Sequence, residues 1–233
     1  MSRQLILKAL VGIGAFAMLF STRSANAQNL LLNPGFENPA DTASGNPGVD
    51  DTTTDWNYLA DCERAQFYNH TSGSLPTGSG GSWSVWLKTF EPAGGGINQA
   101  VAATPGMNYT LNGFLYFESA YPTTAADVYG EIQFEDASSN PIGSPTMFTI
   151  LPASETGNTG SWISEPTISA VAPAGATQVL AQWGWTGGGT VPGQQGAFVD
   201  DVSLTASTVV PEPASFALLG VIGAGLISRR RRH

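Results

Sequence analysis

The chain has 233 residues, of which 12% are charged, and it is rich in Gly (28) and Pro (15), a composition that favours short strands and turns over long helices. Residues 28–208 hold 17 Asp and Glu residues but only two Lys and Arg residues, and this formal charge of −15 argues against nucleic acid as a partner. The single cysteine, Cys62, excludes an intramolecular disulfide.

Residues 1–27 have the features of a cleavable export signal. Arg3 and Lys8 accompany an apolar run of about a dozen residues, which is too short to span ~30 Å of hydrocarbon. Ala25 and Ala27 are small side chains of the kind that signal peptidase accepts, so we expect the mature chain to begin at Gln28. The signal predicts export across the inner membrane.

Residues 28–208 predict one all-β domain, a sandwich of two sheets. Strand-like runs alternate with turns that contain Pro and Gly, as at 104–108 and 172–176, and two polar stretches, 38–55 and 70–81, predict surface loops. The expected strands are 29–36, 82–89, 95–101, 109–117, 129–136, 146–151, 162–171, 178–185 and 197–205.

Several motifs of this domain resemble a known family. They are LLLNPGFE, GINQAV, PGMNYTLNGFLY, GEIQFED, VAPAGATQVLAQWGW and GAFVDDVSLT. Their order is similar to that in carbohydrate-binding modules of the 4/9 type and their galactose-binding-like jelly-roll relatives, over nearly all of residues 29–206. The resemblance implies a jelly-roll sandwich that binds a glycan, here an extracellular polysaccharide, although residues 39–81 match no motif of the family.

The same resemblance implies a structural calcium ion that bridges the first and last strands. The matching residues are Glu37, Asp200 and Asp201. Calcium takes six to eight oxygen ligands, so backbone carbonyls near Gly35 would have to complete the shell. The alternative is that these acids cap strand ends in solvent.

Sugar binding needs aromatic faces with amides and carboxylates nearby. Alternation along 82–87 places Trp83 and Val85 on one side and Trp86 on the other, which favours Trp86 for an open sheet face. The candidates are Trp86, Trp56, Tyr58, Glu131, Gln133, Trp183 and Trp185. Burial in the core is the alternative for each tryptophan. No pair of opposed carboxylates suggests a hydrolase, so we expect a protein that is not an enzyme, with a protein-binding adhesive module as the other interpretation.

The C-terminal residues 209–233 combine three features. Pro211, Glu212 and Pro213 are followed by an apolar segment over 214–228 and by the four arginines Arg229, Arg230, Arg231 and Arg232. This order resembles the PEP-CTERM sorting signal. The resemblance implies a Gram-negative bacterium, an exosortase-type membrane protease or transpeptidase as partner, temporary association with the inner membrane, and a final place at the cell surface or in the extracellular matrix. A simple tail anchor is the alternative.

Overall fold

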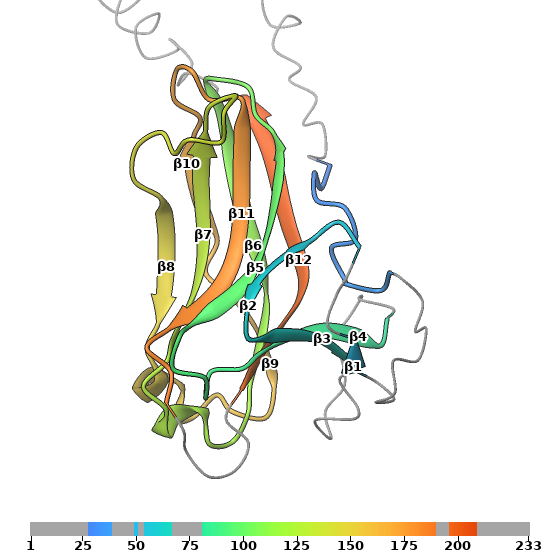
Figure 1. The fold of residues 1–233 in the computed structure, drawn as a ribbon, viewed down its shortest axis with the longest axis vertical. Helices are drawn as coiled ribbons and strands as arrows, with labels where there is room; N and C mark the ends of the chain where they lie inside the picture. Colours follow the sequence, from blue (N-terminus) through green and yellow to red (C-terminus); the bar gives the residue numbers. More distant parts are fainter. Residues whose placement is uncertain (1–27, 39–48, 51–53, 67–80, 190–195, 209–233) are drawn as a thin grey trace, which may run out of the picture.

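Two antiparallel β-sheets pack face to face in the part of the chain that the structure describes (Figure 1). The computed structural model describes residues 28–38, 49–50, 54–66, 81–189 and 196–208. The seven-stranded sheet has the order β1–β3–β4–β12–β6–β10, with β9 also paired to β6, and the five-stranded sheet has the order β2–β5–β11–β7–β8. This arrangement confirms the predicted all-β sandwich.

The strand bounds are β1 (Val49–Asp50), β2 (Asn57–Ala60), β3 (Cys62–Gln66), β4 (Trp83–Leu87), β5 (Gly95–Ala102), β6 (Met107–Phe117), β7 (Asp127–Glu135), β8 (Thr146–Ile150), β9 (Trp162–Ser164), β10 (Ile168–Val171), β11 (Gln178–Thr186) and β12 (Ala197–Thr208), with 3-10 turns η2 (Tyr121–Thr123) and η3 (Pro152–Glu155). The predicted strand 162–171 is divided in two, because Pro166 lacks the N–H that a continuous ladder needs. The strands β1, β2 and β3 were not expected.

The strand expected over residues 29–36 is wrong. Asn33 and Phe36 have positive φ angles of 48° and 57°, which end any extended conformation there. The segment still runs beside the last strand, since the Leu30 N–H donates to the Leu204 carbonyl at 2.8 Å. The two ends of the domain therefore lie together, as the family resemblance implied.

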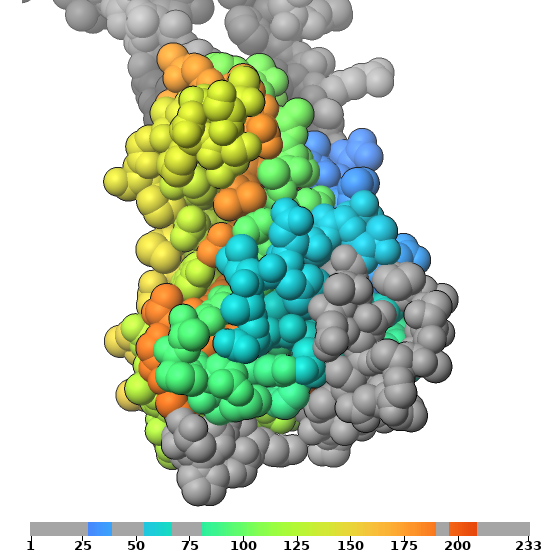
Figure 2. Space-filling model, viewed as in Figure 1, coloured from blue at the N-terminus to red at the C-terminus, as the bar shows by residue number. Residues whose placement is uncertain are grey.

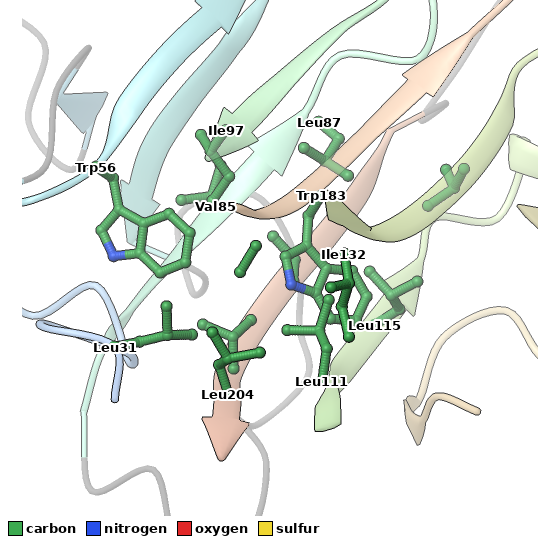
Figure 3. Close-up of a cluster of buried hydrophobic side chains, with 14 of the residues drawn as sticks. Leu31, Trp56, Val85, Leu87, Ile97, Leu111, Leu115, Ile132, Trp183 and Leu204 are labelled. Carbon is green, nitrogen blue, oxygen red and sulfur yellow. The ribbon is translucent and has the colours of Figure 1, made fainter. Parts of the chain in front are cut away.

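The core between the sheets is built around tryptophan (Figure 3). Trp183 is fully buried, and its ring meets Phe148 at a centroid distance of 5.5 Å. Gly113 makes room for it, because a Cβ there would lie 2.8 Å from Trp183 Cζ2. Burial of an aromatic side chain of this size contributes about 1.5–3 kcal/mol, so this ring helps to fix how the two sheets pack.

Alternation along β11 decides what the five-stranded sheet presents outward. Ala181 and Trp183 are buried in the core, whereas Gln182 between them is half-buried and belongs to the opposite face. In this outer face β5, β11 and β7 run side by side (Figure 1), and the face is turned to the viewer in the space-filling view of Figure 2. We call it the open face.

Candidate functional site

One row of side chains crosses all five strands of the open face in register. The strand pairing places Asn57 opposite Asn98, Asn98 opposite Gln182, Gln182 opposite Glu131 and Glu131 opposite Met147. Directly opposite residues share a face with Cβ atoms about 4.5–5.5 Å apart, so these five side chains form one continuous row. Asn57 Nδ2 donates to Asn98 Oδ1 at 3.2 Å, which orients the two amides at one end; Asn98 is 8% exposed, so the exposed amide there is that of Asn57. We call its four polar members, Asn57, Asn98, Gln182 and Glu131, the polar row.

A tyrosine beside two glycines lies next to the polar row. Two residues before Glu131, and on the same face of β7, Tyr129 is opposite Gly184, which is itself opposite Gly96. A Cβ on Gly184 would lie 2.9 Å from Tyr129 Oη, so the phenol extends over a strand that has no side chain to displace it. Gln182 Nε2 donates to Tyr129 Oη at 2.6 Å. The ring is therefore fixed beside the amide of the polar row.

Glu131 is the charged member of the polar row. It is half-buried, and this burial raises the pKa of its carboxyl above 4.5. Among the described residues its carboxylate accepts no hydrogen bond and forms no ion pair. Within the described part of the chain, neither oxygen of Glu131 has a donor.

The structure places the other residues predicted for sugar binding in several environments. Trp56, Trp183 and Trp185 are 6%, 0% and 1% exposed, so their rings belong to the core and offer no face to a ligand. Tyr58 is partly buried and packs against the same core. Gln133 lies on the open face but is covered, because its Nε2 donates to the Phe134 carbonyl at 2.7 Å and approaches the segment between β7 and β8.

Trp86 faces outward from the other sheet. It belongs to an in-register aromatic row in which Trp86 is opposite Phe198, Phe198 is opposite Tyr116 and Tyr116 is opposite Trp162. The rings of Trp86 and Phe198 are stacked at 6.1 Å, and Trp86 Nε1 donates to Glu118 Oε2 at 3.3 Å. The thickness of the sandwich separates Trp86 from Glu131, so these two predicted residues do not form one site.

The three predicted calcium ligands are neighbours. A bulge interrupts the pairing of β12 between Asp200 and Ser203, and Asp201 there has a φ of 46°. A Cβ on Gly35 would lie 3.5 Å from Asp201 Oδ1 and 3.8 Å from Asp200 Oδ1. Glu37 Oε1 accepts the N–H groups of residues 82 and 83 at 2.9 and 3.0 Å. The bulge thus turns two aspartates toward the loop that carries Glu37.

Burial and mutual proximity disfavour the ionised forms of Asp200 and Asp201. Burial raises the pKa of Asp200 well above 3.8, and the nearby carboxylates of Asp201 and Glu37 raise it further. Burial and then Glu37 also raise the pKa of Asp201. Asp200 Oδ2 is buried and has no hydrogen-bond partner among the described residues. In those residues no group of three or more His, Cys, Asp and Glu side chains is arranged so that it could hold a metal ion.

A buried arginine fixes the loop that carries Glu37. Arg64 is fully buried, and its guanidinium donates to the Phe36 carbonyl at 2.6 Å and to the Glu37 carbonyl at 2.9 Å. It also lies 3.8 Å from the centre of the Trp83 ring. Hydrogen bonds from a charged donor to buried carbonyls are stronger than neutral ones, so Arg64 positions this loop against β3 and β4.

Sequence reasoning did not select Asn57, Asn98, Gln182 or Tyr129. One signal was present, because the alternation that places Trp183 and Trp185 on one side puts Gln182 on the other. The alignment of Gln182 with Asn98 and Glu131 depends on the pairing of strands far apart in the chain, which alternation within one strand does not reveal.

Neither a family model nor a curated protein sequence matches the chain. Among solved structures it is similar to the enzymatically active domain of tailspike protein 4 from bacteriophage CBA120, with a TM-score of 0.51 and 14% identity over 77% of this chain and 21% of that chain. A cyclase from Fischerella sp. TAU has a TM-score of 0.50 and 13% identity, covering 79% and 100%. These two matches show a shared fold, and the chain spans about a fifth of the tailspike structure.

Carbohydrate-binding modules are also among the structural neighbours. TmCBM61 in complex with β-1,4-galactotriose has a TM-score of 0.45 and 16% identity, covering 78% of this chain and 100% of that chain.

The residues predicted for export and sorting lie outside the described part of the chain. This holds for Ala25 and Ala27, for the motif 211–213, for the apolar segment 214–228 and for the arginines 229–232. Among the described residues no helix is long and apolar enough to cross a membrane.

Proposed function

We propose that this protein binds a polysaccharide on the open face of its five-stranded sheet. The observation that carries the proposal is the polar row, in which two Asn, one Gln and one Glu meet in register beside the ring of Tyr129. Amides and a carboxylate suit the paired hydroxyls of a sugar, and an aromatic ring suits the apolar face of a pyranose. A row that crosses several neighbouring strands favours a chain of sugars over a single one.

The role that fits this face is binding without catalysis. Glycoside hydrolysis needs two carboxyl groups about 5–9.5 Å apart on opposite sides of the scissile bond. On the outward side of β7 the acids nearest to Glu131 along the strand are four residues away, so their backbone positions are about 13 Å apart. This spacing supports a binding protein.

We further propose that Glu37, Asp200 and Asp201 contribute to a structural calcium site. The fit rests on the partnerless, buried Oδ2 of Asp200 and on the carboxylates beside it. A bound calcium ion would neutralise these charges and link the start of the domain to β12, while Arg64 holds the loop of Glu37 in place.

The proposed setting is the bacterial surface. The export signal, the PEP-CTERM-like tail and the acidity of residues 28–208 support secretion across the inner membrane, processing by an exosortase-type enzyme and delivery to the cell surface or the extracellular matrix. Replacing Arg229–Arg232 by neutral residues should leave the protein in the membrane fraction. Unchanged delivery to the surface would contradict exosortase sorting.

Affinity electrophoresis of the full-length protein across a panel of polysaccharides tests the binding function. We expect retardation by at least one polysaccharide, weakened about tenfold or more by Tyr129→Ala and retained in Trp86→Ala, with folding of both variants checked by their melting temperatures. Loss of binding in Trp86→Ala alone would move the site to the other sheet. Retardation by none would favour a protein-binding adhesive module.

A further inference from the structure

The basic residues of the domain lie in or beside strands of the seven-stranded sheet. Residues 28–208 contain two Lys and Arg residues in total, Arg64 and Lys88. Arg64 belongs to β3 and is buried against backbone carbonyls, and Lys88 follows β4 directly and pairs with Glu63. The five strands of the open face contain no Lys or Arg.

The open face carries negative charge instead. Asp127, Glu131 and Glu135 lie on the outward side of β7 at intervals of four residues, or about 13 Å. Glu131 is the central one and is the one that belongs to the polar row, between Gln182 on β11 and Met147 on β8. The face is therefore acidic along the strand and amide-rich across it.

Solubility alone does not explain the position of Glu131. Carboxylates that only keep a protein soluble remain exposed to solvent, as Asp61 does. Glu131 is half-buried, so its ionised form loses hydration, and no cation among the described residues compensates for that loss. A cationic group on the ligand would supply the missing partner, and the formal charge of −15 would attract it from solution.

We propose that the polysaccharide bound on the open face carries free amino groups, one of which pairs with Glu131. This inference rests on the proposed binding function and names its ligand class, a hexosamine polymer without N-acetyl groups. Its hydroxyls bond to the amides of Asn57 and Gln182, and one ring packs against Tyr129. Acidic polysaccharides are excluded, because their carboxylate or sulfate groups would face Glu131 without any Lys or Arg on these strands.

Three β-1,4-linked hexamers test this inference, because they differ only in the group on C2. Glucosamine has an ammonium group there, N-acetylglucosamine an amide and glucose a hydroxyl. Calorimetric titration of the full-length protein at low ionic strength, at a pH that keeps the amine protonated, should show the glucosamine hexamer binding about tenfold tighter than the other two. Added salt should reduce the difference.

Two variants separate a specific ion pair from general attraction by net charge. Glu131→Gln should abolish the preference for the glucosamine hexamer, whereas Glu91→Gln, the same change in the loop between β4 and β5, should retain it. If both variants lose the preference for the glucosamine hexamer to the same extent, a specific ion pair with Glu131 is overturned.

The inference and the binding function fail in different ways. Equal or tighter binding of the neutral hexamers, or binding of an acidic polysaccharide without the glucosamine hexamer, overturns the amino-sugar inference and leaves polysaccharide binding intact. Absence of binding to the hexamers and to the whole polysaccharide panel overturns both.

Discussion

Replacing Asp200 by asparagine removes one negative charge from a buried position and preserves the shape of the side chain. Asparagine keeps the oxygen that accepts the Asp201 N–H at 2.7 Å. It also puts an amide donor at the position of the partnerless Oδ2, close to the carboxylates of Asp201 and Glu37. In metal-free protein we therefore expect Asp200→Asn to be more stable than the native protein.

The size of the effect follows from the burial of that oxygen. A buried polar atom without a partner costs about 1–3 kcal/mol, and in a domain of this size about 1 kcal/mol changes Tm by about 2–4 °C. The folded-state pKa of Asp200 is raised above 3.8, so the folded protein favours the protonated carboxyl. This contribution to the free energy of unfolding is complete at pH values below 3.8 and is lost as the pH rises through the folded-state pKa. The advantage of Asp200→Asn should thus be largest above that pKa.

Calcium should reverse the order of stability. At a hundredfold excess over Kd a ligand stabilises its protein by about 2.7 kcal/mol, and Asp200→Asn lacks one of the proposed carboxylate ligands. Differential scanning calorimetry in EDTA and in excess calcium measures both effects, with Asp61→Asn in an exposed turn as a control that should change neither. The reasoning is refuted if Asp200→Asn melts below the native protein in EDTA at every pH, or if calcium raises both melting temperatures equally.

Three further predictions concern stability and reactivity. Burial and a nearby carboxylate raise the pKa of Glu165 from 4.5 to about 8, so stability should fall with rising pH across that interval by up to about 1.4 kcal/mol per pH unit. Urea unfolding of Glu165→Gln should lack this slope, and an unchanged slope would contradict the assignment. Burial raises the pKa of the Cys62 thiol to about 12, so Ellman's reagent should react only after unfolding, and rapid labelling of native protein would be inconsistent with this. Gly113→Ala should lower the free energy of unfolding by about 1–3 kcal/mol through its clash with Trp183. Gly157→Ala, which has nothing within 4 Å, should change it by no more than about 0.5 kcal/mol. Equal melting temperatures of the two variants would show that the core adjusts to the added methyl group.

Much of the strand pattern between residues 82 and 208 could be predicted because its signals are local. Alternation marked the strands, and the Pro and Gly residues near 105 and 175 marked the turns between them. The segment 29–36 failed for a local reason too, since its apolar residues suggest a strand whereas Asn33 and Phe36 adopt positive φ angles. The strands β2 and β3 have short and mixed patterns, and their partners β5 and β4 define them.

The candidate site depends on information that a single strand does not contain. Alternation shows that Trp183 and Trp185 share a side, but it does not tell which side faces the core. The structure buries both rings, and the opposite side of β11 presents Gln182. Glu131 could be proposed from β7 alone, whereas its alignment with Gln182 requires the register of two strands that are about fifty residues apart.

The central claim is that the open face binds sugar, and nuclear magnetic resonance tests it most directly. The side-chain amide groups of Asn98 and Gln182 give their own signals, and they can be followed in labelled protein during titration with a polysaccharide fragment that retards it in electrophoresis. We expect these signals and the backbone amides of β5, β7 and β11 to shift together. Shifts confined to the seven-stranded sheet around Trp86, with the polar row unchanged, would contradict the account.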